Sequence, residues 1–174
     1  MDASPAPASF ELLYEQYYNY TSRTLRHFGV PLTDIEDAAQ EVWFAVHRQL
    51  AQFAGRSSYR TWLFGIVVNV ARNRRRASRR RPPPAELPEV LVADGPDPEL
   101  TQLGTDALMQ VRRFLEPLDE ERQVLFVAHL LDDLDAGEVA ELLGIAVETV
   151  YQRVRVLRRS FRRWFDEQQR EGLA

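Results

Sequence analysis

The sequence predicts an all-α protein of two helical domains joined by a proline- and acid-rich linker. Three observations favour this fold class. Apolar residues on both sides of residues 82–104 recur at spacings of three and four, the period of one helix face. No stretch alternates cleanly between apolar and polar residues, so strand signals are weak. Six of the ten prolines lie between Pro82 and Pro98, where the helical period is lost.

Residues 82–104 are interpreted as the linker. Proline fixes its own φ and lacks a backbone donor, so a segment this rich in proline is expected to be extended. Residues 85–110 hold 6 acids and no arginine. The predicted organisation is a disordered N-terminus at 1–8, a helical domain at 9–81, the linker at 82–104 and a second helical domain at 105–170.

Three helices are expected in the first domain. Ser9 is an N-cap residue type, and Gly29 and Pro31 are stop signals, so the first helix should span the residues between them. Its face of three-and-four spacing is predicted to be Phe10, Leu13, Tyr14, Tyr17, Thr21, Leu25 and Phe28.

The second helix is predicted from the spacing of Thr33 and Glu36, which is that of a capping box. Its expected buried stripe is Ile35, Ala38, Ala39, Val42, Val46 and Leu50. The third helix should run from about Tyr59 through an arginine-rich block and end before Pro82. Its expected core face is Leu63, Ile66, Val67 and Val70.

Four helices are expected in the second domain. They are predicted at 105–116, at 119–131 with Asp119 as the N-cap, at 136–143 and at 148–168. Ala140 precedes Gly144 by four residues, and the small residue lets two helices approach while the glycine permits a tight turn. The last two helices are therefore predicted to form a helix-turn-helix, the motif whose second helix enters the major groove of DNA.

The last predicted helix has one apolar face and one cationic face. The apolar face is expected to be Val150, Val154, Leu157 and Phe161, and the polar face Gln152, Arg155, Arg159 and Arg163. Residues 149–163 hold six arginines and no acid. The alternative interpretation is an amphipathic helix whose arginines are merely solvated. DNA binding is favoured, because arginines alone on one face repel one another unless phosphates neutralise them.

The third helix of the first domain carries a second polar stripe. Its members, at spacings of three and four, are Asn69, Arg72, Asn73 and Arg76. Trp62 lies at the edge of this stripe, and an aromatic ring beside amides and arginines suits stacking and hydrogen bonding to unpaired bases. The alternative is that Tyr59 and Trp62 belong to the core, and the spacing leaves both interpretations open.

Composition excludes several classes of protein. The chain has no cysteine, which excludes disulfides and thiolate metal sites. His27, His47 and His129 lie in different predicted helices, the acids Asp132 and Asp133 are interpreted as solvated helix ends, and no glycine-rich phosphate loop is present. Neither a catalytic activity nor a metal nor a cofactor is expected.

Charge and hydropathy bear on partners and location. The net charge of −4 argues weakly against nucleic acid, but a local cationic block decides whether a surface meets phosphate. No apolar run reaches the roughly 18 residues that a membrane span needs. The N-terminus lacks the basic patch and apolar core of a signal peptide. A soluble, cytoplasmic protein without a membrane span is expected.

Three segments carry a resemblance to a known family. They are DIEDAAQEVWFAVHR at 34–48, RSSYRTWLFGIVVNVARNRRR at 56–76 and VAELLGIAVETVYQRVR at 139–155. In this order, and with this linker, they resemble a bacterial RNA polymerase sigma factor of the extracytoplasmic-function group. The resemblance implies that the first domain binds core RNA polymerase and reads the melted minus-ten element, and that the second reads the minus-thirty-five duplex of promoter DNA. A separate anti-sigma factor is a further expected partner.

The resemblance also implies roles for individual residues. It implies a polymerase-binding face at Asp34, Asp37, Gln40 and Glu41. It implies capture of a flipped base at Arg56, Ser57 and Ser58, and a minus-ten strand surface at Tyr59, Trp62, Asn69, Arg72, Asn73 and Arg76. It implies minus-thirty-five readout at Thr149, Gln152, Arg153 and Arg155. The predicted minus-thirty-five DNA-binding surface also includes Arg159 and Tyr151, although Tyr151 stands where the family usually has a basic residue.

Two other functions are compatible with parts of the sequence. A helix-turn-helix regulator acting without polymerase would need a dimer interface for paired half-sites, and no long heptad seam is present. A helical anti-sigma or adaptor protein would not need two arginine blocks without acids. A pull-down with core polymerase separates these alternatives from a sigma factor.

Overall fold

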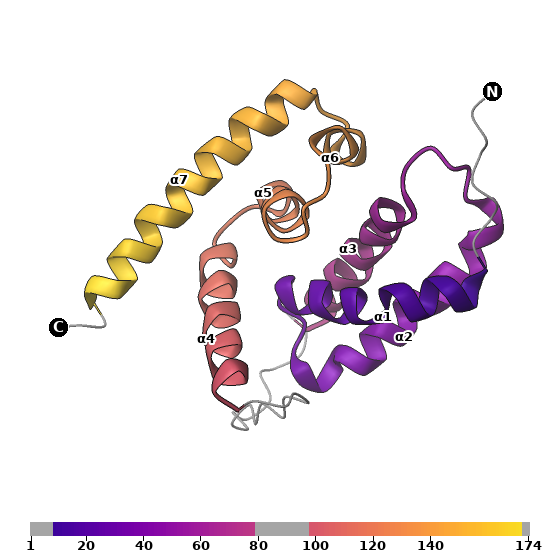
Figure 1. Ribbon diagram of the computed structural model, residues 1–174, viewed down its shortest axis with the longest axis horizontal. Helices are drawn as coiled ribbons and strands as arrows, with labels where there is room; N and C mark the ends of the chain where they lie inside the picture. The colour runs from indigo at the N-terminus through magenta and orange to yellow at the C-terminus, as the bar shows by residue number, and fades with distance from the viewer. Residues whose placement is uncertain (1–8, 79–97, 172–174) are drawn as a thin grey trace. The chain divides into compact units, whose positions relative to one another are not determined.

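The computed structural model describes residues 9–78 and 98–171, and contacts divide the chain into two compact units, Met1–Pro88 and Glu89–Ala174. In the described ranges every regular element is a helix (Figure 1). This confirms the predicted all-α fold class. The predicted disordered N-terminus at 1–8, the last residues of the predicted first domain at 79–81 and residues 82–97 of the predicted linker lie outside the described residues.

The first unit is built from three helices, α1 (Phe10–His27), α2 (Ile35–Gln49) and α3 (Tyr59–Ser78). Short 3-10 turns at Leu32–Asp34 and Leu50–Gln52 flank α2. All three helices pack against one another. Their shared core includes Leu25, Val42, Val46, Phe64 and Val67, each with a side chain almost fully removed from water.

Helix α1 begins where the sequence predicts. The Ser9 hydroxyl accepts a hydrogen bond from the Leu12 N–H at 3.3 Å, which confirms Ser9 as the N-cap. The predicted face is only partly buried, because Tyr14 is 40% exposed. Tyr20 and Thr24, which the pattern did not include, are buried instead.

The predicted capping box at the start of α2 is wrong. Residues 32–34 already form a 3-10 turn, so Thr33 lies inside a helical run and its hydroxyl bonds the Asp34 carboxylate at 3.1 Å. Asp34 is the N-cap, and its side chain makes no capping hydrogen bond. The predicted buried stripe of α2 is confirmed except at Leu50, which starts the next 3-10 turn and is half-buried.

The second unit consists of α4 (Pro98–Leu115), α5 (Glu120–Leu125), a π-helical turn at Phe126–Leu131, α6 (Ala136–Leu143) and α7 (Val147–Glu171). The other helices of the unit all contact α7. Helix α4 begins seven residues before the predicted start at 105, inside the predicted linker. Proline is well suited to the first position of a helix, and Pro98 occupies that position here.

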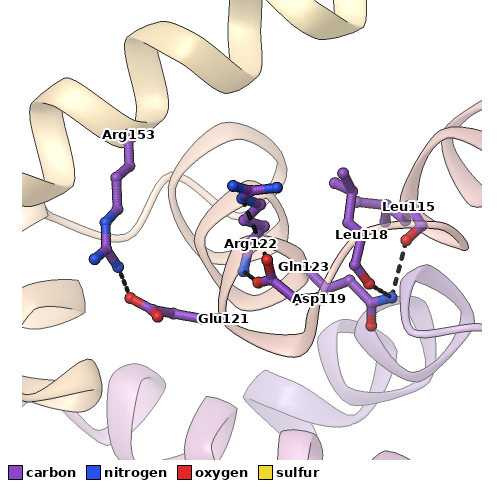
Figure 2. Close-up of polar contacts among 7 residues, drawn as sticks. All are labelled: Leu115, Leu118, Asp119, Glu121, Arg122, Gln123 and Arg153. Atoms are coloured by element: carbon purple, nitrogen blue, oxygen red, sulfur yellow. Dashed lines mark hydrogen bonds and ion pairs between the residues drawn. The ribbon is translucent and has the colours of Figure 1, made fainter.

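The turn between α4 and α5 is tied by polar contacts (Figure 2). Asp119 is the N-cap of α5, as predicted, and its carboxylate accepts from the Arg122 N–H at 2.9 Å. The buried Gln123 amide donates to the Leu115 carbonyl at 2.9 Å and to the Leu118 carbonyl at 3.0 Å. These bonds fix the first turn of α5 relative to the end of α4.

The predicted helix-turn-helix is present in the second unit. Helix α6 is followed by its C-cap Gly144, whose φ of 66° lies in the left-handed region that favours glycine. Ala140 on α6 and Val150 on α7 are both buried, so the two helices meet through small and branched side chains. The C-terminal half of α7 packs in an aromatic cluster. The centroid of the Phe114 ring on α4 lies 5.0 Å from that of Phe161 and 5.7 Å from that of Trp164.

Candidate polymerase and nucleic-acid interfaces

The predicted polymerase-binding residues share one exposed region of the first unit. Asp37, Gln40 and Glu41 lie on α2 at spacings of three and four, which places them on one helix face. Asp34 ends the preceding 3-10 turn. All four residues are exposed. The structure therefore presents an acidic and amide face from the start of α2, which a basic partner surface could meet.

One member of this acidic face is already paired within the chain. The guanidinium of Arg74 on α3 donates to the Glu41 carboxylate at 2.6 Å and to the Asp34 carbonyl at 3.3 Å. Arg74 therefore ties the arginine block of α3 to the start of α2. Reversing the charge of Glu41 would place two cations together, so Asp37 is the cleaner probe of this surface.

An aromatic groove adjoins the acidic face. Gln40 and the 66% exposed Phe44 line an open cavity of about 570 Å³ between α1 and α2. Its remaining lining residues are Phe10, Tyr14, Tyr18, Glu36, Ala39, Trp43 and His47. Sequence periodicity assigned Phe10 and Tyr14 to a single helix face and did not indicate that they open onto a groove.

The loop at 56–58, which precedes α3, contains one exposed arginine and one serine that bonds the first turn of the helix. Arg56 is exposed and Ser57 is half-buried. The Ser58 hydroxyl accepts from the Thr61 N–H at 3.2 Å and shares a hydrogen bond with the Thr61 hydroxyl at 3.0 Å. Ser58 thus stabilises the first turn of α3 in addition to its predicted place beside a flipped base.

The aromatic residues at the start of α3 are neither fully buried nor fully exposed. The Phe53 ring stacks on Tyr59 at 4.4 Å between centroids and lies 5.1 Å from Trp62. Both Tyr59 and Trp62 are half-buried. Each ring therefore packs on a neighbour on one side and keeps area accessible to a ligand.

The polar stripe of α3 reaches solvent along most of its length. Asn69, Asn73 and Arg76 are exposed, and Arg72 is half-buried. Leu63, Ile66 and Val67 are buried as predicted, whereas Val70 is half-buried. Helix α3 consequently has one face in the core and one available to a partner.

Helix α7 separates its faces as predicted. Val150, Val154 and Leu157 are buried, and Phe161 is half-buried. The exposed residues of the predicted readout surface are Tyr151, Gln152, Arg155 and Arg159, while Thr149 and Arg153 are half-buried. The Gln152 amide lies 3.4 Å from the Glu148 carboxylate, one turn earlier.

The side chain of Arg153 is engaged by another helix. Its guanidinium forms an ion pair with the Glu121 carboxylate on α5 (Figure 2). Glu121 is absent from the residues predicted for DNA readout. The two residues are 32 positions apart, and helical periodicity cannot indicate a contact at that separation.

Several titratable groups lie outside the surfaces described above. Among residues 9–78 and 98–171, no three His, Cys, Asp or Glu side chains are grouped to hold a metal ion. Burial, with Arg23 and Arg26 nearby, lowers the pKa of His27 to about 4, so this imidazole is neutral at physiological pH. The His129 Nδ1 donates to the Leu134 carbonyl at 2.8 Å. Asp132 is 1% exposed, so its interpretation as a solvated helix end is wrong.

Within residues 9–78 and 98–171, none of the helices combines the length and the hydropathy of a membrane span.

Comparisons with known proteins agree with the two units. The family model of sigma-70 region 2 matches residues 13–81, and that of sigma-70 region 4 matches residues 108–159. The ECF RNA polymerase sigma-E factor of Escherichia coli K12 is 29% identical over 155 residues, covering 84% of this chain and 81% of that protein. The sigma-E factor of Haemophilus influenzae is 30% identical over 155 residues, covering 84% and 82%.

Two solved structures share the fold. CnrH, in a complex with the cytosolic domain of CnrY, has a TM-score of 0.68 at 24% identity, with 95% of this chain and 92% of that chain covered. The sigma factor RpoE from Bartonella quintana, in a complex with the anti-sigma factor NepR, has a TM-score of 0.66 at 15% identity, with 90% and 96% covered.

A helical unit matching region 2, followed by a helix-turn-helix unit matching region 4, defines a sigma-70-type initiation factor. The chain belongs to the extracytoplasmic-function group of RNA polymerase sigma factors and directs promoter-specific transcription with RNA polymerase. Sigma factors are generally not enzymes. A regulator acting without polymerase would leave the region 2 match unexplained.

Proposed function

We propose that the exposed start of α2 binds core RNA polymerase, that α3 and the loop before it hold the melted minus-ten strand, and that α7 reads the minus-thirty-five duplex. The observation that carries this division is the two-faced α7. Its Val150 and Val154 face is buried, while Gln152, Arg155 and Arg159 are exposed on a helix that follows the tight turn at Gly144. This is the geometry in which a recognition helix enters a major groove.

The surface of α3 suits a different form of DNA. Phe53 packs against the rings of Tyr59 and Trp62. Both rings are only half-buried, so part of their area remains available for a base to stack on. Exposed Asn69 and Asn73 add amide groups that can bond base edges, and Arg76 adds a charge for the backbone. Stacking and edge contacts of this kind require unpaired bases.

The chain itself has no proposed catalytic activity, because the polymerase supplies the chemistry. Its proposed location is the cytoplasm, where that enzyme acts. A separate anti-sigma factor is a proposed partner. Support comes from RpoE of Bartonella quintana, which shares the fold and is found in a complex with the anti-sigma factor NepR.

Replacing Trp62 with alanine should slow open-complex formation more than it weakens binding of the holoenzyme to closed duplex. Stacking of a base on an aromatic ring is worth about 1–3 kcal/mol, and this contact forms only after the strand is unpaired. Permanganate reactivity of promoter thymines in the reconstituted holoenzyme measures opening directly. This experiment tests the proposed role of α3.

Trp62→Phe is the matched control for that experiment, since phenylalanine keeps a ring for stacking and should open the promoter more readily than alanine. Circular dichroism must show the same melting temperature for both variants and the original chain. Normal thymine reactivity in the Trp62→Ala holoenzyme would assign the ring to the core alone. The opening role would then move to the loop at 56–58.

A further inference from the structure

The recognition helix contains one arginine that is held by a carboxylate from outside the helix. Arg153 extends from α7 toward α5, and its guanidinium pairs with Glu121 (Figure 2). Arg155 and Arg159 differ from it, because in the described part of the chain neither belongs to an ion pair. The three arginines therefore present their charges to DNA under different constraints.

This ion pair is poorly placed to stabilise the fold. The side chains of Arg153 and Glu121 are 42% and 43% exposed, and exposed ion pairs contribute little to folding because water and salt screen them. The packing of the two helices rests on apolar residues instead. Leu125 on α5 and Val150 on α7 are fully buried, and the two helices are in contact.

The backbone at Glu121 belongs to a helical turn that neighbouring side chains hold in place. Glu121 lies in the first turn of α5, two residues after the N-cap Asp119 and two residues before the buried Gln123. Gln123 donates to the Leu115 carbonyl at the end of α4 and to the Leu118 carbonyl in the turn that follows, and Asp119 caps α5 through the Arg122 N–H. The carboxylate therefore projects from a turn with little freedom to move.

A carboxylate on one edge of a guanidinium affects what the other edge can bind. Arginine has five N–H donors in a planar fork, so a bond to one terminal nitrogen restricts the plane and leaves donors for a second partner. A bidentate contact with the O6 and N7 atoms of guanine needs that fixed plane. The same negative charge repels a phosphate and makes a backbone contact less favourable.

We propose that Glu121 is a positioning residue for promoter readout, which holds Arg153 for a base-edge contact with guanine in the minus-thirty-five duplex and disfavours contact with phosphate. This inference rests on the proposed role of α7. Glu121 itself need not touch the DNA. Its effect is on which base pair is preferred rather than on whether DNA is bound.

The test uses the full chain assembled with core polymerase and a library of promoter duplexes randomised over the minus-thirty-five element. Glu121→Gln should reduce the preference at one base pair by at least about threefold, part of the about 5- to 150-fold that a bidentate arginine–guanine contact provides. Arg153→Ala should abolish the preference at that same base pair. The double variant should match Arg153→Ala, because Glu121 acts only through that arginine.

Two controls separate positioning from general effects of charge and stability. Glu116→Gln removes an equivalent exposed carboxylate just beyond α4 and should leave the preference profile unchanged. Glu121→Asp keeps the carboxylate and should retain more of the preference than Glu121→Gln. Melting temperatures of the variants, measured by circular dichroism, should match that of the original chain.

Three results would overturn the inference. An unchanged profile in Glu121→Gln, with an altered one in Arg153→Ala, would leave the readout by α7 intact and remove the positioning role alone. If Glu121→Gln increased the affinity of the holoenzyme for all promoters equally, Glu121 would only repel DNA through its charge and would have no positioning role. An unchanged profile in Arg153→Ala would remove this arginine from the readout surface and the positioning role with it.

Discussion

Replacing Asp37 with arginine is expected to weaken assembly with core RNA polymerase by several kcal/mol, the cost of bringing like charges together across an interface. Asp37 is exposed on the face of α2 that also carries Gln40. If this acidic face meets a basic surface of the polymerase, a new cation there is repelled. Fluorescence anisotropy of the labelled chain titrated with core enzyme measures the loss.

The choice of Asp37 follows from the contact between Arg74 and Glu41. A reversal at Glu41 would disturb the packing of α2 on α3 as well as the outer surface. Glu15→Arg makes the same charge change at an exposed position of α1 and should leave the affinity near that of the original chain. Wild-type affinity in Asp37→Arg would remove this face of α2 from the polymerase interface.

Replacing Gln152 with alanine is expected to relax base preference in the minus-thirty-five element, whereas Arg159→Ala should weaken binding to all sequences alike. A specific bidentate contact to a base is worth about 1–3 kcal/mol of discrimination. Loss of one phosphate contact lowers affinity uniformly and reduces the salt slope by about 1. A promoter library and a salt titration of holoenzyme binding measure the two effects separately.

Arg163, one turn beyond Arg159 on the same exposed side of α7, should behave like Arg159 in this comparison. Ser160→Ala, a change at an exposed neutral position of α7, is the control and should alter neither preference nor salt dependence. If Gln152→Ala leaves the preferred sequence unchanged, the register assigned to the recognition helix is wrong.

The helix-turn-helix was predictable from local sequence because its signals are local. The positive φ at position 144 favours glycine, and Val150, Val154 and Leu157 repeat with the helical period. Helix α6 has the predicted bounds. The arginine-rich face that α7 presents between residues 149 and 163 follows from the same periodicity.

Other features depend on tertiary packing or on competing local signals. Thr33 and Glu36 fit a capping box in sequence, yet Thr33 lies inside a 3-10 turn that follows Pro31. The proline-rich pattern assigns Pro98 to the linker, whereas in the structure Pro98 is the first residue of α4. The pairs Arg74–Glu41 and Arg153–Glu121 join residues 33 and 32 positions apart, so only the packed fold brings them together.

The division of promoter recognition between α3 and α7 can be measured directly with a tethered cleavage reagent. The chain has no cysteine, so a single introduced cysteine can carry an iron chelate that cuts nearby DNA. In the open complex, a probe at Ser57→Cys should cut around the minus-ten element and a probe at Arg158→Cys around the minus-thirty-five element. Cutting by both probes at one element, or by neither at its assigned element, would contradict the proposed function.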